Sequence, residues 1–204
     1  MIRLTKDDPR TKKRLALSIL VSFVLVFPMG VLGFILYPPD YSAEVPVYPV
    51  GMLLFSELAA ALLIIAGSLM AIKLADEREV LPAGGFTIFS ISQGLIMVTN
   101  FEIMAGNSNV ESLETTFQMY VGTFMLAFPA ILLISTYSKY PRWLNLFTLI
   151  SVLPYITTNI LFLLGSRDFK LFDLISSFSF VMQGAVFTIW GIYAWKHRYE
   201  GMQG

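Results

Sequence analysis

The sequence predicts an all-α protein, a polytopic membrane bundle of six transmembrane helices that forms one domain over residues 1–204. Two features of composition indicate this class. Hydrophobic residues make up 56% of the chain and charged residues 14%, whereas about a quarter of a soluble domain is charged. The charges also cluster between six apolar runs, each with the roughly 20 residues that a helix needs to cross a bilayer. The expected helices cover residues 15–37, 50–73, 82–104, 115–137, 143–165 and 171–195.

The first apolar run, residues 15–37, follows a basic segment, as the apolar part of a secretory signal peptide does. It is too long for that part, and Tyr37-Pro38-Pro39 follows it in place of a small-residue cleavage site. We therefore expect this run to be retained as the first helix.

Prolines mark particular positions in four of these helices. Pro82 suits the first turn of the third helix, where its missing N–H removes no hydrogen bond. Pro28, Pro129 and Pro154 fall inside the first, fourth and fifth helices. A proline there removes a backbone donor and bends the helix. We interpret these three as kinks in preference to gates.

The distribution of basic residues predicts the orientation. Twelve of the fourteen lysines and arginines lie in the N-terminal segment, the second and fourth loops and the C-terminal segment, and the other two, Arg167 and Lys170, lie in the fifth loop. Cytoplasmic loops carry the excess of Lys and Arg. Both termini are therefore expected in the cytoplasm. The absence of a glycosylation sequon and of a cleavable signal favours a bacterial inner membrane.

Two short matches suggest a 3+3 inverted repeat. The first helix contains FVLVFP at residues 23–28 and the fourth contains FMLAFP at residues 124–129. The third and sixth helices each carry Gln-Gly near mid-span, at Gln93 and Gln183. Inverted halves of three helices are the plan of many transporters. Chance remains the alternative, because these residues are common in membrane helices and the second and fifth helices show no match.

Glu57 is the most informative single residue, because a carboxylate inside a membrane helix is costly and normally faces a partner. With the predicted orientation, Glu57 and most other intramembrane polar groups fall in the outer leaflet, on helix faces that point away from lipid. We expect these faces to converge on a pocket open to the outside. The alternative is a structural network of hydrogen bonds between helices. The candidate ligand-binding residues are Glu57, Gln93, Asn100, Glu102, Asn159, Asp173 and Gln183.

Several functional classes are disfavoured. The chain has no cysteine, and its one histidine, His197, lies beyond the last apolar run, so no cofactor or metal site is expected. The formal net charge is zero, which gives no indication of nucleic-acid binding. No nucleotide-binding, protease or hydrolase motif is present.

Three functions stay open. The first is a small transporter or channel whose outward pocket binds a small polar or cationic solute or a lipid headgroup. The second is a non-enzymatic accessory or scaffolding subunit of a larger membrane complex. An intramembrane enzyme with Glu57 or Glu102 as general base is third, because no nucleophile–base spacing can be identified. The expected partners are membrane lipids, together with a second copy of the chain or other membrane subunits.

Overall fold

The computed structural model of the protein describes residues 8–40, 47–104, 125–166 and 168–197, without the side chains of Glu102, Phe169, Asp173 and Ser176. The predicted all-helical class is confirmed for these residues, and they contain no strand beyond a single antiparallel bridge between Asp40 and Val47. The helices are α1 (Pro9–Leu36), α2 (Val50–Asp76), α3 (Val80–Met104), α5 (Arg142–Ile150), α6 (Leu153–Leu163) and α7 (Phe169–Lys196). A further apolar helix covers Met125–Ile134.

Five helical stretches are long and apolar enough to cross a membrane. They are Pro9–Leu36, Val50–Asp76, Val80–Phe101, Arg142–Leu163 and Lys170–Lys196. The fourth predicted helix, residues 115–137, is described only in part. Its helical portion ends at Ile134, where Tyr137 N donates to Ile134 O at 3.2 Å in a turn. Residues 115–124 lie outside the described residues.

Side-chain caps explain where the first and last helices begin. Asp8 Oδ1 accepts a hydrogen bond from Arg10 N at 3.0 Å, and Pro9 occupies the first helical position. α1 therefore begins six residues before the start predicted from hydrophobicity. Asp168 accepts in the same way from Leu171 N at 3.0 Å, so α7 begins at Phe169.

The span predicted over residues 143–165 corresponds to the helical stretch Arg142–Leu163, which is interrupted within its length. The stretch is divided into α5 and α6 at Ser151 and Val152. Pro154 lies in the first turn of α6, and it has no N–H to continue the α-helical ladder. Ser151 N still bonds Phe147 O at 2.9 Å, whereas Val152 N bonds Leu149 O at 3.3 Å in a tighter turn. The interruption therefore lies beside Pro154, where the sequence predicted a kink.

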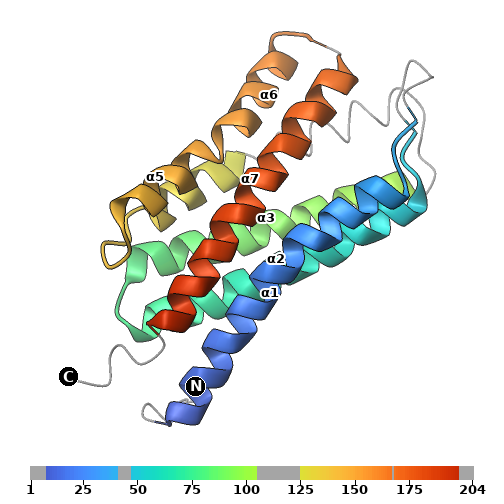
Figure 1. The fold of residues 1–204 in the computed structure, drawn as a ribbon. Helices are drawn as coiled ribbons and strands as arrows, with labels where there is room; N and C mark the ends of the chain where they lie inside the picture. Colours follow the sequence, from blue (N-terminus) through green and yellow to red (C-terminus); the bar gives the residue numbers. More distant parts are fainter. Residues whose placement is uncertain (1–7, 41–46, 105–124, 167, 198–204) are drawn as a thin grey trace.

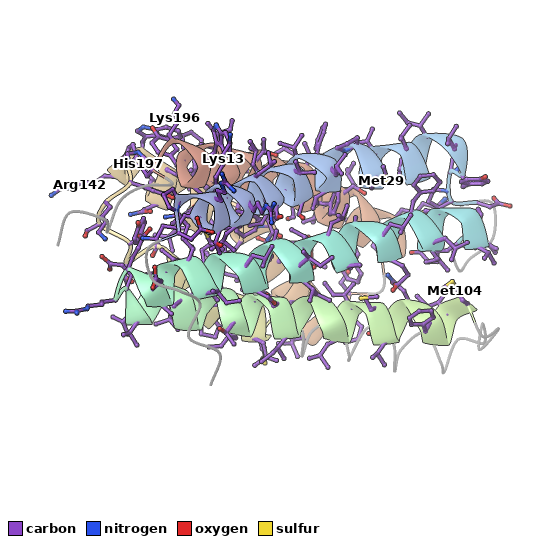
Figure 2. The ribbon with its side chains drawn as sticks, turned by 90° about the horizontal axis from the view of Figure 1, so that it is seen from below. Lys13, Met29, Met104, Arg142, Lys196 and His197 are labelled. Carbon is purple, nitrogen blue, oxygen red and sulfur yellow. The ribbon has the colours of Figure 1, made fainter. Side chains whose placement is uncertain are left out.

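The helices pack in a simple order. α1 packs against α2 and α7, α2 packs against α3, and α7 packs against α5 and α6. Figure 1 shows α1 and α2 side by side, with α7 crossing in front of α3. α1 begins and α7 ends at the same end of the bundle (Figure 1). Figure 2 shows Lys13, Arg142, Lys196 and His197 at that end, which we call the basic end, and Met104 at the other.

Small residues allow these helices to approach closely. A Cβ atom added at Gly67 of α2 would lie 2.5 Å from Ser90 Oγ of α3. One added at Gly30 of α1 would lie 2.1 Å from Cε1 of Phe180 on α7. Close backbone approach through small residues is typical of helix association in membranes.

A layer of buried aromatic side chains joins α1, α3 and α7. We call Phe23, Phe86, Phe89, Phe187 and Trp190 the aromatic layer. The Phe89 and Phe187 rings lie 4.7 Å apart, and Phe23 stacks on Phe187 at 5.3 Å. Trp190 Nε1 donates to Thr148 Oγ1 of α5 at 3.0 Å, which satisfies its buried donor. This layer fills the core between the basic end and the middle of the bundle.

Candidate functional site

Glu57 lies on the buried face of α2, where 7% of the residue is exposed. Its neighbours on this face of the helix, Leu53 and Ala60, are also buried and apolar. The contact of Gly67 with Ser90 fixes the relative positions of α2 and α3. Glu57 is ten residues from Gly67 toward the end opposite the basic end, or about 15 Å at 1.5 Å per residue. The carboxylate is therefore inside an apolar span and well away from the aromatic layer.

The Glu57 carboxyl receives no hydrogen bond of acceptable geometry from any described residue, at either oxygen. Asn100 of α3 lies beside it. The Asn100 amide nitrogen also donates to Ser56 Oγ of α2, at 3.3 Å. A buried carboxylate is costly unless it is paired or hydrogen-bonded. Glu57 therefore has acceptor capacity that the described part of the protein does not use.

Gln93 and Gln183 lie on the same side of the aromatic layer as Glu57. Gln93 is one helical turn beyond Phe89 along α3, and Gln183 is one turn before Phe187 along α7. The two phenylalanines are in contact, and both glutamines are buried. The two amides therefore extend the buried polar groups from the aromatic layer toward Glu57.

Ser179 adds a buried hydroxyl to this half of the bundle. It lies one turn beyond Gln183 on α7 and is fully buried. Its Oγ makes no hydrogen bond with the described residues. Phe180, the next residue, packs on Gly30 of α1. Three residues further along α1, Gly33 contacts Phe55 of α2, which is two residues from Glu57. Ser179 and Glu57 are thus at similar depth.

The other predicted site residues are less well placed. Asn159 lies on α6, which packs against α7, and its side chain is half-buried. Glu102 belongs to α3 and Asp173 to α7, but both side chains lie outside the described residues. Their membership of the site stays a prediction. The structure therefore brings Glu57 and Asn100 together and places Gln93 and Gln183 on facing helices.

A charged network at the basic end was missed by the sequence analysis. Glu77 pairs with Lys73 one turn earlier and accepts a hydrogen bond from Tyr137 Oη at 2.8 Å. Lys139 Nζ lies 3.7 Å from Glu77 Oε2 and 3.4 Å from Glu79 Oε1. We call these five residues the Glu77 network. It joins the turn between α2 and α3 to the segment that follows the helix Met125–Ile134.

The backbone of this turn explains why Glu77 points inward. Arg78 adopts a left-handed conformation with a φ of 65°. Glu79 N donates to Leu74 O at 2.9 Å and Arg78 N donates to Ala75 O at 3.1 Å. This is the Schellman arrangement that ends many helices, usually with glycine at the left-handed position. It holds Glu77 at the end of α2, where the side chain is 5% exposed.

Burial and the nearby charge also affect Tyr137. Burial raises the pKa of the Tyr137 phenol, and the neighbouring Glu77 carboxylate raises it further. The phenol therefore stays protonated and keeps donating to Glu77. The i, i+4 spacing of Lys73 and Glu77 was visible in the sequence. The pairing of Glu77 with Tyr137, sixty residues away, was not.

Comparison with known proteins gives no family for this chain: no family model, curated protein or solved structure matches it.

Proposed function

We propose that the protein is an integral membrane transporter or channel-like protein, with a binding site in the half of the bundle away from the basic end. Glu57 is the centre of this site, with Asn100, Gln93 and Gln183. The solute is small and polar or cationic, or it is the headgroup of a lipid. The positive-inside rule puts the basic end in the cytoplasm and the site in the outer leaflet. A bacterial inner membrane is the proposed location.

The observation that carries this proposal is the Glu57 carboxyl, buried in an apolar span with no hydrogen bond from the described residues. Ionisable groups inside membrane spans are rare, face the bundle interior and commonly mark solute or ion pathways. The Asn100 amide lies beside Glu57 and also donates to Ser56 Oγ, so one polar side chain of α3 is already next to the carboxyl.

The aromatic layer supports access from one side. It lies between the polar residues and the basic end, and its rings continue through Trp190 to Tyr140 at 4.9 Å. A solute that reaches Gln93 and Gln183 from the outer side would meet these rings next. The aromatic layer is therefore consistent with entry of the proposed solute from the outer side.

The test is solute uptake by purified protein in liposomes. The probes are radiolabelled sodium, rubidium, choline and ethanolamine, each compared with protein-free liposomes. We expect uptake of at least one probe, and a loss of at least about tenfold in Glu57→Gln, which keeps the side-chain shape but removes the charge. The matched control is Ser92→Ala, since Ser92 is buried on α3 and its Oγ bonds Phe89 O within its own helix.

Uptake that is the same in Glu57→Gln as in the natural protein would overturn the proposal. So would the absence of uptake for all four probes, combined with purification of the chain as a fixed-stoichiometry complex with other membrane proteins. That second result would favour the accessory-subunit function.

A further inference from the structure

We infer that the Glu57 site takes a protonated amine with a hydrocarbon body, in preference to a metal ion or an anion; this inference rests on the proposed function. Three features of the site support this ligand: its charge, the apolar residues beside Glu57 and the hydrogen-bonding capacity of the Glu57 carboxyl.

The charge at the site selects a cation. Glu57 is the only ionisable residue of α2 before Lys73, and Lys73 pairs with Glu77 at the basic end. α3 offers no cation at all, because its one charged residue is Glu102. A carboxylate taken out of water is stabilised by a positive partner with good hydrogen-bond geometry. The described residues provide none, so the ligand is expected to bring the positive charge.

The composition of the site disfavours a metal ion. Within the described ranges, no three His, Cys, Asp or Glu side chains come together as a metal-binding group. Calcium needs six to eight oxygen ligands, and magnesium keeps several waters in a strict octahedron. One carboxylate with apolar neighbours at Leu53 and Ala60 cannot replace such a hydration shell.

The unused hydrogen-bonding capacity fits an ammonium group. Both Glu57 oxygens are buried acceptors without a hydrogen bond of acceptable geometry from the described residues. An ammonium with N–H groups can donate to separate acceptors, whereas a quaternary ammonium cannot donate. Charge-assisted bonds of this kind are the strongest hydrogen bonds available in proteins.

The walls fit a hydrocarbon body. Leu53 and Ala60, which flank Glu57 on α2, are both buried and apolar. Apolar surface removed from water contributes about 25 cal/mol per Å². An alkyl chain therefore adds affinity that a small hydrated cation does not gain.

The experiment measures binding of hexylammonium chloride to the full chain in detergent, by calorimetry. The comparison ligands are hexanol, hexyltrimethylammonium and sodium chloride. We expect hexylammonium to bind, and binding to weaken at least about tenfold in Glu57→Gln and to be unchanged in Ser92→Ala. Hexanol lacks the charge and hexyltrimethylammonium lacks the N–H donors, so both should bind more weakly. Partitioning into the detergent is the same for all variants, and for each ligand it is subtracted with protein-free detergent.

Three results would overturn the inference, and they differ in what they leave standing. Equal binding of hexyltrimethylammonium, or sodium binding that depends on Glu57 without hexylammonium binding, rejects the amine and leaves the transport proposal standing. Hexylammonium binding unaffected by Glu57→Gln, together with uptake unaffected by it, rejects both. If Glu57→Gln does not fold, Glu57→Asp replaces it. This change moves the carboxylate back by one methylene, so hexylammonium binding should weaken. Unchanged hexylammonium affinity in Glu57→Asp would reject the amine.

Discussion

The Glu77 network gives the clearest prediction about stability. In Glu77→Gln the side chain keeps an oxygen that can accept from Tyr137, so the change removes mainly the charge. Lys73 would then be left as a buried cation, with 8% of its side chain exposed. Breaking a buried ion pair by removing one partner costs about 3–5 kcal/mol. We expect about 3 kcal/mol here, because the flexible stem of Lys73 can carry its ammonium toward water.

The assay is reversible unfolding of the purified protein in mixed micelles with increasing denaturing detergent. The control is Glu79→Gln, since Glu79 is 26% exposed and its partner Lys139 is 39% exposed. Such exposed pairs contribute about 0–1 kcal/mol. The loss in Glu77→Gln should also depend little on salt, because buried pairs are weakly screened. A loss in Glu77→Gln no larger than that in Glu79→Gln would refute the argument, since it would mean that Glu77 is effectively solvated.

Two other variants test the packing and the pH dependence. Gly30→Ala places a methyl group against the Phe180 ring, so we expect a loss of about 1–3 kcal/mol in the same unfolding assay. Gly94→Ala is the control, because a methyl added there meets nothing within 4 Å, and it should stabilise its helix by about 0.5–1 kcal/mol. Equal effects of Gly30→Ala and Gly94→Ala on the free energy of unfolding would contradict the packing of α1 on α7. Burial and the Glu77 charge raise the pKa of Tyr137 above its ordinary value of 10.0. The protonated Tyr137 phenol therefore contributes fully to the stability of the folded protein below about pH 10, and this contribution is lost as the pH rises further. Tyr137→Phe should flatten the fall in stability between about pH 10 and pH 12, and an unchanged alkaline profile would count against the buried phenol.

The fold class was predictable because it depends on local properties of the sequence. Long apolar runs and sparse charge indicate membrane-spanning helices without any knowledge of tertiary contacts. The start of α1 was misplaced because hydrophobicity does not detect a cap, whereas Asp8 followed by Pro9 is a start signal that could have been used. The division at Ser151 and Val152 was missed because Pro154 permits either a kink or a new helix start. Only the local hydrogen bonds decide between these outcomes.

The candidate site was predictable in part, for a related reason. Burial of Glu57, Gln93, Asn100 and Gln183 follows from polar residues on helix faces that avoid lipid. The bond between Asn100 and Ser56 depends on the register of α2 against α3, which the sequence does not reveal. The Glu77 network was not predictable for the same reason, because Glu77 bonds Tyr137, a residue sixty positions away. The inverted repeat stays a prediction.

The claim that Glu57 binds a ligand, and is not a packing residue, is tested most directly by native mass spectrometry. The measurement compares the gently purified natural protein with Glu57→Gln. We expect a chain, or a closed oligomer of it, that retains a small cationic molecule. In Glu57→Gln that molecule should be lost, with no change in the oligomer. Natural protein that carries no small molecule and appears in fixed stoichiometry with other membrane proteins would contradict it.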